Sequence, residues 1–178
     1  MRKFAISDIH GCNKTFLALL EKIQFSTADE LYLLGDYIDR GPDSKGVIDS
    51  IFNLQKTGYQ VHCLLGNHEL MMLEAFSDND VEDGNMNHWL MNGGVATIQS
   101  FVTKDGTPDI PDVYFQFAQN LQFYLELDNY ILVHAGLNFR SLNPFADMES
   151  MLWIRNWYNK IESEWLRGRI VVHGHTPI

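Results

Sequence analysis

The chain has 178 residues, 46% of them hydrophobic and 20% charged, with a formal net charge of −10 at pH 7. This length suits one domain, predicted here as residues 1–178, with enough apolar residues to bury a core. The acidic charge argues against a nucleic-acid or membrane-surface binder, which needs basic patches. No apolar run approaches the roughly 20 residues that span a bilayer, and Asp8 and His10 interrupt any signal-peptide core. We therefore expect a cytoplasmic protein whose partners include neither nucleic acid nor membrane.

The first third of the chain predicts alternating strands and helices. Short buried strands are predicted at 4–7, 31–34 and 61–65. One helix is predicted after a cap at Asn13, and another near Pro42 and Asp43. A third helix is predicted from Leu70. Strands that alternate with helices favour a parallel sheet.

The second half has a different pattern. Residues 77–85 form an acidic segment, interpreted as a solvated loop or, alternatively, a lid. Residues 86–121 predict helix with an interruption at 107–108 and a cap at Asp109 or Asp112. Residues 122–133 predict a β-hairpin with a tight polar turn, so the second part of the sheet system should be antiparallel or mixed. Helical spacing returns at 143–166, where Trp153 is interpreted as partly exposed packing rather than a binding platform.

Five apolar runs each end in Asp, Asn or His. In chain order, the segments that follow them are Asp8-Ile9-His10-Gly11, Gly35-Asp36-Tyr37-Ile38-Asp39-Arg40-Gly41, Gly66-Asn67-His68-Glu69, His134-Ala135-Gly136 and His173-Gly174-His175. Any one of them is open to interpretation as an ordinary polar turn. The carboxyl ends of strands, however, are where open α/β sheets gather ligand-binding residues. Five such ends in one chain therefore predict a site.

The residue types at these ends predict a pair of metal ions. Carboxylate, amide and imidazole ligands without thiolate suit Mn, Fe or Zn, and Mn²⁺ is our expectation. The predicted ligands are Asp8 and His10 for one ion, Asn67, His134 and His175 for a second, and Asp36 as the bridge. His173 competes with His175, which the Gly-His order favours. Two ions about 3.5–4 Å apart clamp a phosphate ester and generate a hydroxide between them.

Hydrolysis of a phosphate ester also needs a proton for the leaving group. His68 is the predicted general acid, and Asp39 is the carboxylate predicted to orient its imidazole. Arg40 and Arg155 are predicted to grip phosphate oxygens, with Asn67 as a further phosphate contact. Glu69 is expected to fix the local turn or the helix start rather than to bind metal.

In order and spacing, these segments resemble the signature blocks of the phosphoprotein phosphatase branch of the calcineurin-like metallophosphoesterases. The nearest likeness is to small bacterial and phage serine/threonine phosphatases and to the related symmetrical dinucleoside tetraphosphatases. The resemblance implies the metal, acid and phosphate roles given above, and Trp153-Ile154-Arg155 is similar to a phosphate-clamping Trp-x-Arg segment. It also implies an α/β fold with a central mixed β-sandwich flanked by helices, in four layers α/β/β/α.

Two departures from that family pattern stand out. Eukaryotic members carry an arginine just before Gly66, where this chain has Leu65, so one phosphate contact is expected to be absent or supplied elsewhere. The chain also stops at Ile178, three residues past His175, where the family usually continues with further strands. We therefore expect the second sheet to lack its C-terminal strands.

Three functions are consistent with these patterns. The first is a metal-dependent phosphomonoesterase, acting on a phosphorylated protein as a serine/threonine phosphatase or on a small phosphoester. The second is a symmetrical dinucleoside tetraphosphate hydrolase with the same metals. The third is an inactive metal-binding interaction module, against which the intact pair of His68 and Asp39 argues.

Overall fold

The computed structural model describes residues 1–77, 84–155 and 166–177. The strands are β1 (Lys3–Ile6), β2 (Glu30–Leu33), β3 (Gln60–Cys63), β4 (Tyr124–Glu126), β5 (Tyr130–Val133) and β6 (Ile170–Val172). The helices are α1 (Asn13–Lys22), α2 (Ser44–Lys56), α3 (Asn67–Ala75), α4 (Gly84–Trp89), α5 (Val95–Ser100), α6 (Asp112–Gln119) and α7 (Met148–Trp153), with a π-helical turn η1 (Leu90–Gly94) and a 3-10 turn η2 (Pro144–Ala146). Within the described ranges, every helix is too short or too polar to cross a membrane.

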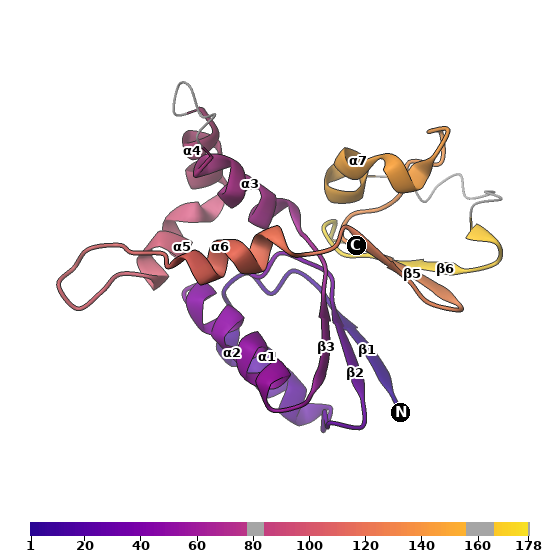
Figure 1. The fold of residues 1–178 in the computed structure, drawn as a ribbon, viewed down its shortest axis with the longest axis horizontal. Helices are drawn as coiled ribbons and strands as arrows, with labels where there is room; N and C mark the ends of the chain where they lie inside the picture. The colour runs from indigo at the N-terminus through magenta and orange to yellow at the C-terminus, as the bar shows by residue number, and fades with distance from the viewer. Residues whose placement is uncertain (78–83, 156–165, 178) are drawn as a thin grey trace.

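The strands form two three-stranded sheets (Figure 1). The first has the order β1-β2-β3 and is parallel throughout, as the alternation of strands and helices predicted. The second has the order β4-β5-β6, in which β4 and β5 form the predicted antiparallel hairpin and β6 pairs parallel to β5. The second sheet is therefore mixed, as expected.

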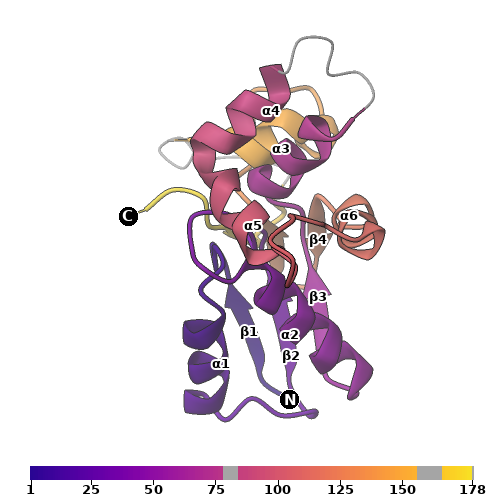
Figure 2. The same ribbon diagram turned by 90° about the vertical axis from the view of Figure 1, so that its left-hand side faces the viewer.

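The side chains of β2 show how the layers are stacked. Leu31 and Leu33 point to one face of the first sheet and pack in a core with α1 and α2. The alternate residues Tyr32 and Leu34 point to the other face and pack against Leu132 of the second sheet. The far face of the second sheet packs against α7 in a third cluster. The layers are therefore stacked in the order α1 and α2, first sheet, second sheet, α7. Figure 2 shows α1 and α2 lying over the first sheet. The predicted α/β/β/α sandwich is confirmed.

One of the two predicted helix caps in the first half is wrong. Asn13 is the first residue of α1 rather than its cap. Its side chain instead donates to Asp43 Oδ2 at 3.0 Å and accepts from Ser50 Oγ at 2.9 Å, so partners distant in sequence take its polar atoms. Asp43 does cap α2, because its Oδ1 accepts the backbone N–H of Gly46 at 2.9 Å.

The helical middle also differs in detail from prediction. The break between α5 and α6 spans 101–111, wider than predicted. Pro111 occupies the cap position of α6, so neither Asp109 nor Asp112 caps it, and Asp112 favours the helix start only through its charge. α3 begins at Asn67, before Leu70. Most of the acidic segment at 77–85 lies outside the described residues. The same holds for the last part of the predicted helical region at 143–166.

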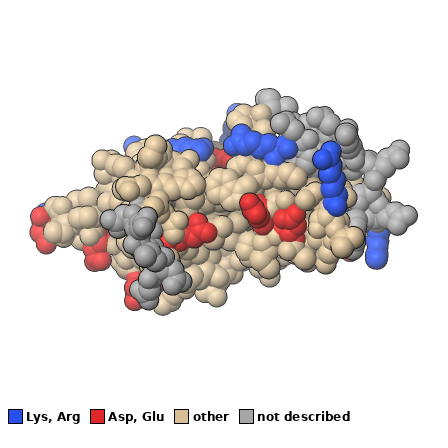
Figure 3. Space-filling view, turned by 90° about the horizontal axis from the view of Figure 1, so that it is seen from above, with Lys and Arg blue, Asp and Glu red and all other residues tan. Residues whose placement is uncertain are grey.

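The face of the molecule seen in Figure 3 carries both positive and negative side chains. In this view, Lys and Arg lie along the upper edge and at the right-hand end, and Asp and Glu lie mainly across the middle and at the left-hand end. Both cysteines are free, and Cys12 is exposed whereas Cys63 is largely covered.

Candidate functional site

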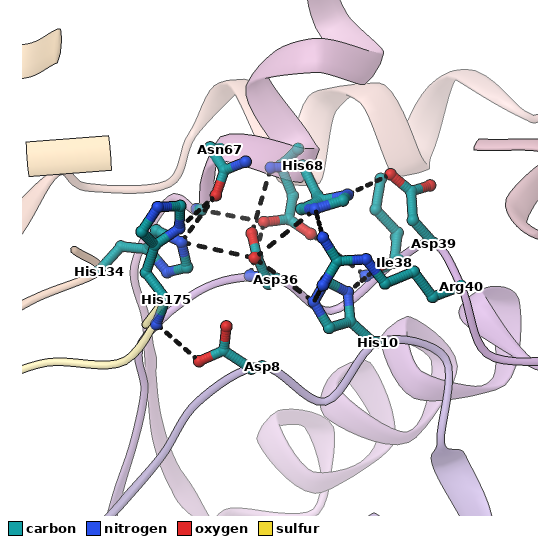
Figure 4. A network of polar contacts seen from close by, with 12 residues as sticks. Asp8, His10, Asp36, Ile38, Asp39, Arg40, Asn67, His68, His134 and His175 are labelled. Carbon is teal, nitrogen blue, oxygen red and sulfur yellow. Dashed lines mark hydrogen bonds and ion pairs between the residues drawn. The ribbon is translucent and has the colours of Figure 1, made fainter. Parts of the chain in front are cut away.

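The polar strand ends meet at one edge of the two sheets and surround a cavity of about 510 Å³ (Figure 4). Asp8 and His10 follow β1, Asp36 follows β2, Asn67 and His68 follow β3, His134 follows β5, and His175 follows β6. The described residues that line the cavity are Asp8, His10, Asp36, Arg40, Asn67, His68, Asn92, Trp153, Arg155, Gly174, His175, Thr176 and Pro177. The structure therefore brings the predicted site residues together, with Asp39 and His134 buried directly behind this lining.

The loop after β2 is held by the buried carboxylate of Glu69. Its Oε1 accepts the backbone N–H groups of Tyr37 at 2.8 Å and Ile38 at 3.3 Å. Its Oε2 accepts those of Asp36 at 2.9 Å and Gly66 at 3.1 Å. Glu69 therefore fixes its own helix start, as expected, and also the neighbouring loop that carries Asp36.

The backbone of the site is strained. Among the described non-glycine residues, eight have positive φ, and six of these are predicted site residues: Asp8, His10, Asp36, Asp39, Arg40 and His175. Left-handed backbone is disfavoured for residues with a side chain and persists where the surroundings enforce it. Such outliers concentrate at functional sites, so their gathering here supports a site independently of the motifs.

The surroundings of His134 test whether a cation suits the second predicted metal site. Its Nδ1 lies 2.8 Å from the carbonyl oxygen of Leu34, which only accepts, so Nδ1 carries the hydrogen. In a neutral imidazole Nε2 then carries a lone pair. This Nε2 lies 2.9 Å from Asn67 Oδ1 and 3.4 Å from Asp36 Oδ2. Within the described structure, the buried Nε2 of His175 has no hydrogen-bond partner. Because these acceptors converge, the donor set fits a divalent cation.

The first predicted metal site is arranged differently from expectation. Ligand atoms of His10, Asp36 and His68 lie within 4.8 Å of one another, whereas Asp8 belongs to neither such group formed by the described residues. Oδ2 of Asp8 instead accepts the backbone N–H of His175 at 3.0 Å. The guanidinium of Arg40 donates to His10 Nε2 at 2.8 Å and to His68 Nε2 at 2.9 Å. Its positive charge thus lies against the nitrogen predicted to ligate the first ion.

The electrostatics of the site favour bound cations. Burial lowers the pKa of His10, His134 and His175 to about 4 each, so these imidazoles are neutral and present lone pairs at physiological pH. Burial also raises the pKa of Asp36 to about 6, since nothing nearby fully compensates its charge. A cation between these groups would supply that compensation.

His68 and Asp39 form the hydrogen-bonded pair that the sequence predicted. His68 Nδ1 lies 2.7 Å from Asp39 Oδ2, and both side chains are buried. Burial opposes the charged imidazole, but the hydrogen bond to Asp39 and the negative charges of Asp36, Asp39 and Glu69 together outweigh burial and raise the pKa of His68. Sequence reasoning missed two residues that also bond to Asp39, Trp89 and Thr97. A buried tryptophan needs an acceptor for its N–H, which was the available signal.

The remaining candidates lie around the cavity mouth. Arg155 is exposed and lines the cavity, as does Trp153 with 36% of its surface accessible. The Trp153 ring lies 6.2 Å, edge to face, from the ring of His175, so this partly exposed side chain packs against a residue of the candidate site. His173 bonds to its neighbour through Nδ1, whereas His175 contacts Asn67, in agreement with the choice between them.

Comparisons with known proteins agree with this geometry. A family model described as "Calcineurin-like phosphoesterase" matches residues 1–178. A "Bis(5'-nucleosyl)-tetraphosphatase, symmetrical" from Nitrosomonas europaea is 34% identical over 138 residues, which cover 77% of this chain and 45% of that protein. The "Serine/threonine-protein phosphatase 2" of Salmonella typhimurium is 29% identical over 159 residues, which cover 86% of this chain and 67% of that protein. The solved structure of a cold-active protein tyrosine phosphatase shares the fold, with a TM-score of 0.63 and 18% sequence identity. The match covers 99% of this chain and 64% of that protein. The chain spans about half the length of the tetraphosphatases that it matches.

Proposed function

Because this chain belongs to the calcineurin-like phosphoesterase family, we propose that it hydrolyses a phosphoanhydride of a dinucleoside polyphosphate with the help of two divalent cations. The similarity to the symmetrical tetraphosphatases carries this choice of substrate. The exposed face of Trp153 beside the cavity supports it, since aromatic side chains provide stacking surfaces for bases. Water would cleave the central anhydride of a dinucleoside tetraphosphate and release two nucleoside diphosphates.

The cations would be held by the converging lone pairs described above. Asp36 lies in both groups of ligand atoms and would bridge the two ions. One ion would be held by His134, His175 and Asn67, and the other by His10 and Asp8. Bound divalent cations supply Lewis acidity, which offsets phosphate charge and lowers the pKa of water. Mn²⁺ is the proposed metal, with Fe or Zn as alternatives, because the donors are oxygen and imidazole.

Side chains of this chain supply the remaining steps. Asp39 accepts the Nδ1 hydrogen of His68 and thereby turns Nε2 toward the cavity, where it would protonate the leaving oxygen. Arg40 and Arg155 line the same cavity and would bind phosphate oxygens. Arg40 would exchange its hydrogen bonds to the two imidazoles for bonds to the substrate.

A second candidate function is hydrolysis of phosphoserine or phosphothreonine, which was the first expectation from the motifs. The similarity to the Salmonella serine/threonine phosphatase, over a larger share of both proteins, supports it. A non-catalytic module would not need the pair of His68 and Asp39.

The deciding experiment compares kcat/KM on diadenosine tetraphosphate and on a phosphothreonine peptide, with one preparation and added Mn²⁺. We expect at least a tenfold preference for the tetraphosphate, with ADP as the product. A preference for the peptide would establish the second candidate, and no turnover of either would favour the inactive module. His68→Asn and a chelator are the controls, since activity that survives both would come from a contaminant.

A further inference from the structure

The carboxylate of Asp39 accepts hydrogen bonds from three side chains, although only His68 was predicted to contact it. Besides His68 Nδ1, the indole Nε1 of Trp89 lies 3.1 Å from Oδ1 and 3.0 Å from Oδ2. The hydroxyl of Thr97 lies 2.6 Å from Oδ1. All four residues are buried, with at most 1% of their surface exposed. Donors therefore surround an otherwise desolvated anion, as a buried charge requires.

The hydroxyl of Thr97 has a fixed direction. The backbone N–H of Asp39 donates to Thr97 Oγ1 at 2.8 Å, and this oxygen also lies 3.0 Å from Ser44 Oγ. A hydroxyl has one hydrogen, and the carboxylate oxygen at 2.6 Å accepts only, so Thr97 gives that hydrogen to Asp39. Thr97 thus holds both the main chain and the side chain of Asp39, whose φ of 71° lies in the left-handed region.

Trp89 contributes a donor that binds both carboxylate oxygens and cannot act as an acceptor. Its ring packs against Gly94, where an added Cβ would lie 2.5 Å from a ring atom, so a side chain at position 94 would displace the indole. The same helical stretch supplies the carbonyl of Gly93, which accepts the backbone N–H of Arg40 at 3.2 Å. The stretch α4-η1-α5 therefore clamps the loop that carries Asp39 and Arg40.

We propose that Trp89 and Thr97 are positioning residues for proton donation, because they hold the Asp39 carboxylate in the orientation in which Oδ2 faces His68 Nδ1. Without their hydrogen bonds, the carboxylate would turn or admit water, and His68 would lose the partner that directs Nε2 into the cavity. Neither residue touches the cavity, so they act through Asp39. This inference rests on the proposed function, in which His68 is the proton donor.

The experiment uses Trp89→Phe and Thr97→Val, which remove one donor each and keep most of the shape. The readout is kcat/KM on 4-nitrophenyl phosphate, whose leaving group needs no proton, and on an alkyl phosphate, whose leaving group does. We expect about a tenfold or greater loss on the alkyl ester and less than a threefold loss on the aryl ester. Thr97→Ser keeps the hydroxyl and should restore the wild-type ratio, and Gly94→Ala should reproduce Trp89→Phe by displacing the ring.

A second readout needs no turnover and therefore separates this inference from the proposed function. Proton–nitrogen NMR of the His68 ring should show the Nδ1 hydrogen protected in the wild type and in Thr97→Ser. It should be lost to exchange in Trp89→Phe and Thr97→Val. Equal losses on both esters, or an unchanged Nδ1 signal in folded variants, would overturn the positioning role. If no ester or anhydride is hydrolysed at all while the NMR result holds, the proposed function fails and proton donation with it, whereas the role of Trp89 and Thr97 in orienting Asp39 and the His68 ring stands.

Discussion

Replacing Glu69 by glutamine should destabilise the folded protein, because this carboxylate accepts four backbone N–H groups at 2.8–3.3 Å. The amide keeps one oxygen and can retain two of these bonds, but its NH₂ group then faces the other two donors. Each hydrogen bond to a charged group contributes about 1.5–3 kcal/mol, and an unsatisfied buried donor costs a similar amount. Relief from burying a charge offsets part of this loss, since burial raises the pKa of Glu69. We expect a net loss of about 2–4 kcal/mol.

Urea unfolding monitored by circular dichroism measures this free energy. Glu74→Gln is the matched control, because Glu74 lies on the same helix but is exposed, and it should change the unfolding free energy by less than about 0.5 kcal/mol. If Glu69→Gln matches this control, the four contacts do not hold the loop. Isothermal titration calorimetry should also show a weaker affinity for Mn²⁺ in Glu69→Gln, because the displaced loop carries Asp36.

Three other predictions test separate parts of the site. Asp36→Asn should reduce bound Mn²⁺ from two ions per chain to one or none by elemental analysis, and two retained ions would rule out a required carboxylate bridge. Trp153→Ala should raise KM for diadenosine tetraphosphate about tenfold, the scale of one base–aromatic stack, and leave 4-nitrophenyl phosphate unaffected; an equal change on both would remove the stacking role. Iodoacetamide at neutral pH should label exposed Cys12 and spare Cys63, whose pKa burial raises to about 12; mass spectrometry that finds labelled Cys63 in the folded protein would contradict this.

The sequence was sufficient to predict the fold class and the meeting of the polar residues. The alternation of strands and helices and the meeting of the polar residues follow from local patterns, because short apolar runs end just before Asp36 and His134, whereas the four-layer sandwich was implied by the family resemblance. Parallel pairing then places those ends on one edge of a sheet without further information. The hairpin of β4 and β5 was likewise predicted from a tight polar turn between two apolar runs.

What the sequence did not predict depends on partners distant along the chain. Trp89 and Thr97 lie on helical stretches that read as ordinary core, and no spacing relates them to Asp39. Asn13 fits the composition of a cap, yet Asp43 and Ser50 take its side chain. The place of Asp8, bonded to the backbone of His175, likewise requires the two sheets to be assembled first.

The left-handed backbone at six site residues has a consequence for how stability and activity are related in this protein. Glycine would adopt those dihedral angles with less strain than the residues present, although aspartate and histidine adopt them more readily than most other residues with side chains. Backbone conformation alone would therefore favour glycine over histidine or arginine at such positions. Substitutions there can yield variants that are more stable and less active, a trade-off expected where a site is built at the expense of its scaffold.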